Sequence, residues 1–139
     1  TEVWYLLNSN SGKTTITVTF ANSSSDRKTA FVWEVSGGLT AFDVASALGN
    51  QTGSGTTNTG SPVTTATSSG FVVGVICTAN SISQNPKSGN EFTSGGDIQD
   101  NYSNTAGCSL ISTTQASHTP VWLNGTSGAV FVTSTAAFK

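Results

Sequence analysis

The chain has 139 residues, with five basic and seven acidic side chains, one histidine, no methionine and a formal net charge of −2. This length fits one domain with its own hydrophobic core, and the lack of clustered Lys and Arg argues against nucleic acid as a partner. Counting along the sequence gives 21 Ser and 23 Thr, a composition that favours short β-strands with polar faces and supplies few acids, bases or metal ligands.

The first predicted strand covers residues 3–7, an apolar run that we expect to be covered on both faces. A second apolar run at residues 31–35 ends at a pair of glycines and predicts another strand. We expect Trp4 and Trp33, which lie within these runs, to belong to the core.

Between them, residues 15–20 alternate with a period of two. Ile16, Val18 and Phe20 share one face and threonines occupy the other. This pattern predicts a half-buried antiparallel strand.

In the middle of the chain, Asp43 is a candidate cap for one helical turn over residues 43–48. Residues 49–60 are rich in Gly and polar side chains and are expected to form a loop. Residues 62–67 contain several threonines and begin with a proline, which predicts an edge strand.

Residues 71–78 are apolar without alternation, so we expect a central strand covered on both faces. A loop anchored by Phe92 follows, and further strands are predicted at 109–114, 119–123 and 129–138, the last of them interrupted at Ser134. No helical periodicity of useful length is present. The sequence therefore predicts an all-β fold, a single antiparallel β-sandwich of about eight strands spanning residues 1–139.

No apolar run reaches membrane-spanning length. Because the chain starts at Thr1 and has no methionine, we expect a cleaved leader, a trimmed tail or a longer parent protein. The composition suggests a protein of the cell surface or extracellular space.

Two cysteines, Cys77 and Cys108, have a spacing that permits a disulfide closing a loop of about 30 residues. Two unrelated buried thiols are the alternative. Four Asn-X-Ser/Thr motifs lie where we predict turns or loops and are candidate glycosylation sites: Asn22, Asn50, Asn101 and Asn124.

Several stretches together resemble a jelly-roll-like β-sandwich domain that recurs in large secreted and cell-surface proteins of bacteria and archaea. They are Val-Trp-Tyr at 3–5, Thr-Ile-Thr-Val-Thr-Phe at 15–20, Glu-Val-Ser-Gly at 34–37, the Phe-Asp-Val-Ala-Ser-Ala run within 42–55, Pro-Val-Thr-Thr at 62–65, Phe-Val-Val-Gly-Val at 71–75 and Ala-Ala-Phe-Lys at 136–139. The resemblance implies an adhesin or scaffold module without catalytic residues. Such domains usually have further strands before the Val-Trp-Tyr segment, and strands missing there would leave an open groove beside the first sheet.

Motifs for catalysis are weak. Ser-Gly-Lys-Thr at 11–14 lacks the upstream glycine of a phosphate-binding loop, so we interpret it as a hairpin turn. His118 is followed by Thr-Pro and no Gly-X-Ser-X-Gly elbow exists, which favours a loop histidine over a catalytic triad. Glu34 with Glu91, or Asp97 with Asp100, could pair as glycosidase carboxylates, but Glu34 is expected to face solvent or an opposing strand.

The best cation candidate is the segment containing Asp97, Asp100 and Asn101, whose oxygen ligands suit Ca²⁺. Asp43 could join them only through the fold. The alternative is an Asx-rich turn, and no other cofactor is expected.

Sugar binding would use exposed aromatic rings as stacking platforms. Trp122 and Tyr102 are the candidates, with Asn124 and Asp100 as polar contacts.

The function that these patterns favour is a non-enzymatic subunit of an extracellular fibre or surface assembly. Its open sheet edge would be filled by a strand from a neighbouring copy of the chain, which makes the chain its own main partner. The edge and core residues of that hypothesis are Trp4, Leu6, Ile16, Val18, Phe20, Phe131 and Phe138. The alternatives are a carbohydrate-binding module and a spacer domain of a large adhesin.

Overall fold

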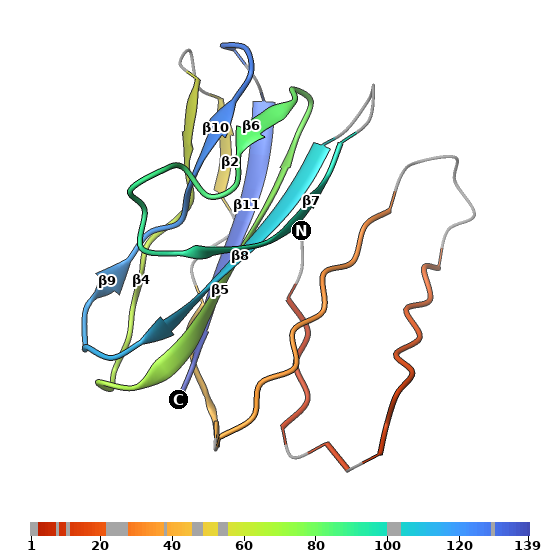
Figure 1. The fold of residues 1–139 in the computed structure, drawn as a ribbon, viewed down its shortest axis with the longest axis vertical. Coiled ribbons are helices and arrows are strands. Elements are labelled where there is room, and N and C mark those ends of the chain that lie inside the picture. The colour runs from red at the N-terminus through yellow and green to blue at the C-terminus, as the bar shows by residue number, and fades with distance from the viewer. Residues whose placement is uncertain are drawn as a thin grey trace.

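A computed structural model of the chain describes residues 3–7, 9–10, 12–21, 28–37, 39–45, 49–52, 56–99, 104–128 and 130–139. Within these residues the fold is all-β, with eleven strands, antiparallel pairing and no helix (Figure 1). It follows that this part of the chain contains no helix long and apolar enough to span a membrane. The predicted fold class is confirmed.

The large sheet follows the order β1 (Phe42–Ala45), β11 (Val130–Phe138), β5 (Gly70–Thr78), β8 (Asn104–Ser112) and β7 (Thr93–Ile98). Strand β2 (Gly49–Thr52) pairs with the other half of β11. Because β7 pairs with β8 alone, it forms one outer edge of this sheet.

The small sheet has the order β3 (Thr57–Thr59), β10 (Val121–Asn124) and β6 (Ile82–Gln84), and β4 (Val63–Thr64) pairs separately with β9 (Ser117–His118). One cluster of buried side chains joins the large and small sheets. It contains Val72, Ile76, Ala106, Cys108, Phe131 and Ala137 of the large sheet, Ile82 and Trp122 of the small sheet, and Val63 and Phe92 from outside these two sheets. The two sheets therefore pack face to face as a sandwich.

Strand β5 is central and buried on both faces, as its apolar sequence predicted. Val72 and Ile76 point into the sandwich. Phe71 and Val73 point to the outer face, where they form a second cluster with Ala136 and Phe138. Val3, Trp33 and Leu39 from the beginning of the chain pack against this outer cluster.

The first third of the chain differs from the prediction. Residues 3–7, 15–20 and 31–35 belong to no strand, although the sequence pattern predicted one in each. Trp4 is 87% exposed, so its assignment to the core was wrong, whereas Trp33 is half-buried. A strand-like pattern predicts an extended backbone, but it does not specify the strand that pairs with it.

Several boundaries also shift. Phe42 starts strand β1, so the described part of 43–48 is a strand and not a helical turn. The predicted loop at 49–60 contains β2 and β3. Strand β11 runs without interruption through Ser134, and Phe92 is buried as predicted.

The expected disulfide is absent, because Cys77 and Cys108 are both free thiols. In the register of β5 and β8, Cys108 lies opposite Gly74 and Cys77 lies opposite Thr105. The cysteines are therefore three rows apart, roughly 10 Å along the strands, and on opposite faces of the sheet. A disulfide needs Cα atoms within about 7 Å of each other, so the register excludes this bond. Of the two interpretations considered, separate thiols are correct.

Candidate functional site

A projecting segment, residues 12–21, carries three exposed apolar side chains at alternating positions. Ile16, Val18 and Phe20 alternate along it and are 67%, 51% and 48% exposed. Figure 1 shows the segment as the outermost trace, well away from the strands of the sandwich. The predicted apolar face is present, and it packs against neither sheet.

The backbone of the projecting segment also lacks a pairing partner among the described residues. No backbone hydrogen bond joins residues 12–21 to another residue in the part of the chain that the structure describes. An extended segment with open N–H and C=O groups and one apolar face has the properties that promote pairing with another chain. This segment is the first candidate functional site.

The chain before the projecting segment is held on the sandwich by an aromatic cluster. The ring of Tyr5 stacks on Phe42, with centroids 5.4 Å apart, and meets Phe138 edge-on at 5.4 Å. Phe42 and Phe138 are 5.7 Å apart and belong to the neighbouring strands β1 and β11. The cluster fixes residues 3–7 against the outer face of the large sheet.

The chain after the projecting segment is held by Trp33, in what we call the Trp33 slot. Gly95 on β7 and Gly107 on β8 form the floor of this slot. A Cβ atom added at either glycine would lie 2.9 Å from the Trp33 ring. Since real side chains do not approach so closely, the ring fits only because both positions lack a side chain. Phe31 extends the contact, with its ring 6.0 Å from that of Trp33.

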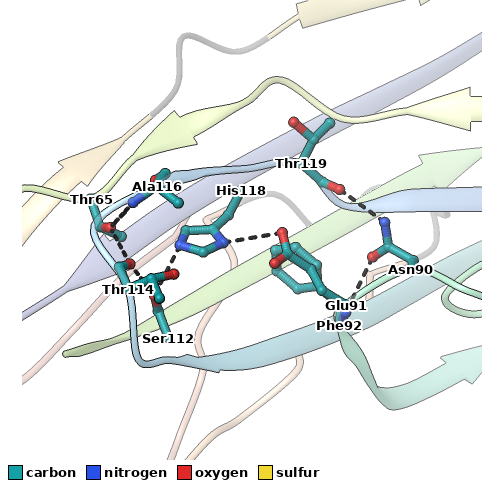
Figure 2. Close-up of polar contacts among 9 residues, drawn as sticks. All are labelled: Thr65, Asn90, Glu91, Phe92, Ser112, Thr114, Ala116, His118 and Thr119. Atoms are coloured by element: carbon teal, nitrogen blue, oxygen red, sulfur yellow. Dashed lines mark hydrogen bonds and ion pairs between the residues drawn. The ribbon is translucent and has the colours of Figure 1, made fainter. Parts of the chain in front are cut away.

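The second candidate site surrounds His118 (Figure 2). Its Nε2 lies 2.9 Å from the Ser112 Oγ, and its Nδ1 lies 3.1 Å from the Glu91 Oε1. Ser112 ends β8, His118 lies on β9 and Glu91 lies between β6 and β7. Three parts of the chain therefore meet at one imidazole, which is 3% exposed.

Thr65, which follows β4, forms hydrogen bonds with the turn between β8 and β9. Its N–H donates to the Ala116 carbonyl at 3.0 Å, and its Oγ1 accepts from the Ala116 N–H at 3.2 Å. The Thr65 hydroxyl also lies 3.3 Å from the Thr114 carbonyl. The turn between β8 and β9 is thus fixed by backbone and side-chain contacts.

Ser112, His118 and Glu91 contact one another in the same order as the serine, histidine and acid of a hydrolase triad. Ser112, however, is 2% exposed, and its hydroxyl donates to the Thr114 carbonyl at 2.8 Å. A substrate carbonyl cannot reach a hydroxyl enclosed in this way. The contacts of Ser112, His118 and Glu91 therefore favour a structural role, which holds the turn against the loop that carries Glu91.

His118 is thus not the loop histidine that the sequence suggested, because it is buried on β9. The sequence contains a pattern that indicates the burial of His118. Extending the alternation of β10 backwards from Trp122 places Pro120 and His118 on the same side, and all three are buried.

The predicted sugar platform is wrong for Trp122. This ring is fully buried between the sheets, and its Nε1 donates to the Asn85 Oδ1 at 2.9 Å. Asn124, the expected polar contact, is 3% exposed, and neither atom of its amide group has a partner in the described part of the chain. Tyr102 lies outside the described residues.

The predicted cation site is described only in part. The Asp97 Oδ2 accepts from the Gln99 Nε2 at 2.7 Å, whereas Asp100 and Asn101 lie outside the described residues. Asp43 cannot join Asp97, because β1 and β7 are opposite edges of the large sheet, four strand spacings or about 19 Å apart. Its carboxylate instead contacts the Lys139 Nζ at 3.3 Å. No group of three or more His, Cys, Asp or Glu side chains suited to a metal occurs among the described residues.

The glycosylation candidates are also only partly described. Asn22 and Asn101 lie outside the described residues, as does the side chain of Asn50 on β2. Asn124 is buried, so that prediction was wrong, because a transferred glycan needs an accessible amide.

One cavity of about 170 Å³ is lined by Lys87, Ser88, Gly89, Asn90 and Val121. It includes none of the contacts made by His118 and none of the projecting segment.

No family model, curated protein or solved structure matches the chain.

Proposed function

We propose that the protein is a non-enzymatic structural subunit of an extracellular fibre or surface assembly, built by exchange of a β-strand between copies. The projecting segment supports this most directly. It presents a strand-like apolar face that its own sandwich leaves exposed, and a backbone that is unpaired among the described residues. Pairing with another copy would bury the face and satisfy the backbone.

The free energy gained by burying the exposed apolar side chains favours such an association. Burying a large apolar side chain contributes about 1.5–3 kcal/mol, and Ile16, Val18 and Phe20 are each about half exposed or more. Head-to-tail exchange between identical copies produces a filament when the rotation from one copy to the next does not close into a ring. The small number of charges in the chain suits close lateral packing of such filaments.

A triple substitution tests the proposal. Changing Ile16, Val18 and Phe20 to Ser removes the apolar face but touches neither sheet. We expect assembly to be lost while the melting temperature of the dispersed subunit changes little. The matched control changes Thr15, Thr17 and Thr19 to Ser on the opposite face. Unaltered assembly of the Ile16/Val18/Phe20 variant would contradict the proposal.

A further inference from the structure

We infer that the exchanged element is the projecting segment, used as a strand tethered at both of its ends, and that it adds to the edge strand β7 of a second copy. This inference rests on the proposed function and specifies which segment is donated and which edge receives it. It excludes a mechanism in which a free end of the chain threads between two strands.

The tethers are the two aromatic contacts described above. Tyr5 holds the chain before the segment on Phe42 and Phe138, and Trp33 holds the chain after it on the floor of Gly95 and Gly107. The part between them is attached on both sides to a sandwich with which it shares no backbone hydrogen bond among the described residues. A segment tethered in this way can lie along the open side of a strand, where only one set of hydrogen bonds must form.

We identify the acceptor strand by comparing the length of the donor with the lengths of the outer strands. The alternating run of residues 15–20 spans about 20 Å when extended. Strand β7 has six residues, all exposed, and pairs with β8 on one side only. The other outer strands among the described residues are shorter, with four residues in β1 and β2, three in β3 and β6, and two in β4 and β9. Among the described outer strands, β7 alone is as long as the donor.

Charge and shape agree with this choice. In antiparallel pairing, the Lys13 end of the donor meets the end of β7 that carries Asp97, so opposite charges come together. Ile98 is 50% exposed on β7 and offers an apolar contact. The register of β7 with β8 shifts between Ser94 and Asp97, so the donor has to pair with β7 on either side of a bulge.

Cross-linking between chains that each carry one introduced cysteine tests the inference. Both chains carry Cys77→Ser and keep the buried Cys108. A Val18→Cys chain is mixed with a Thr93→Cys chain under assembly conditions and treated with a short bismaleimide. Any 18-to-93 product must then join two molecules. The control acceptor is Thr57→Cys on β3, and the control donor is Leu6→Cys, which lies before the projecting segment and is exposed.

We expect the 18-to-93 product to exceed the 18-to-57 and 6-to-93 products several-fold. Two results would overturn the inference and leave the proposed function standing. In both, fibres form; in the first a control cross-link dominates, and in the second no cross-linked product is found. If the wild-type chain stays monomeric by sedimentation and no product joins two molecules, the proposed function fails and the inference fails with it.

Discussion

The Ser112 Oγ lies 2.9 Å from the Nε2 of His118, and both side chains are almost completely buried. This contact joins the end of β8 to β9, and the contact of His118 with Glu91 extends it to the loop before β7. The arrangement has the residue types of a triad without the access that catalysis needs.

Removing the Ser112 hydroxyl should therefore reduce stability and not an activity. We expect Ser112→Ala to lower the free energy of unfolding by about 1–3 kcal/mol, because the buried imidazole nitrogen loses its partner. Ser117→Ala is the matched control, since Ser117 is the exposed neighbour on β9, and it should change stability by less than about 0.5 kcal/mol. Denaturant unfolding followed by circular dichroism measures both. Equal effects of the two variants would contradict this role.

The two cysteines should react very differently with thiol reagents. Cys77 is half-buried, whereas burial raises the pKa of the Cys108 thiol to about 12, with the backbone hydrogen bond to Gly74 opposing the shift. Because the thiolate is the reactive form, we expect Cys77 to be labelled first in the native protein and Cys108 only on unfolding. Mass spectrometry of the labelled peptides measures this. Reducing agent should leave the melting temperature unchanged, and a decrease would indicate a disulfide.

The same raised pKa predicts a loss of stability in alkali. The unfolded thiol ionises near its ordinary value of 9.0 and the folded thiol near 12. Since the unfolded state loses its proton first, stability falls as pH rises from 9 towards 12, by about 1.4 kcal/mol per pH unit from this group. Below pH 9 the Cys108 thiol makes no contribution to the pH dependence of stability. Comparison with Cys108→Ala isolates the effect, because that variant should lack this part of the slope.

Gly107→Ala should displace Trp33 and leave the sandwich folded. The added methyl group would lie 2.9 Å from the ring, and the ring can move away because residues 28–37 form no strand. We expect one more tryptophan to become accessible to acrylamide quenching, while Trp122 stays buried. In a Trp33→Ala background the same substitution should have a smaller effect on stability, because the close neighbour that remains is the Phe31 ring, 3.1 Å from the added methyl group. An unchanged quenching profile in the single variant would argue against the Trp33 slot.

Asn124 should carry no glycan even when the protein is produced in a host that modifies Asn-X-Ser/Thr. Its side chain is 3% exposed and points into the sandwich beside Trp122 on β10. Glycopeptide mass spectrometry is the direct measurement. A modified Asn124 in folded protein would show that this end of the small sheet is open.

The sequence predicted those features that depend on local pattern. The apolar run of β5 indicated a strand with both faces covered, and Phe92 was correctly identified as an anchor. The role of Trp122 could not be predicted in the same way, because its burial depends on the large sheet and on Asn85, 37 residues away in sequence. The contact between Cys108 and Gly74 likewise depends on the register of two distant strands.

The alternation of Ile16, Val18 and Phe20 also shows that a local pattern does not specify contacts with distant segments. The pattern correctly indicated an apolar face, but the half-buried strand expected there is absent from the described residues. Pairing is a property of two segments, and within the described chain this one has no partner. In the proposed assembly, a second copy of the chain supplies that partner.

Electron microscopy of the native material, at a resolution that traces neighbouring chains, would decide whether strands are exchanged between subunits. Strand exchange predicts continuous fibres in which residues 15–20 of one subunit lie as a strand in the sheet of the next. Isolated compact particles, with residues 15–20 folded onto their own sandwich, would contradict it.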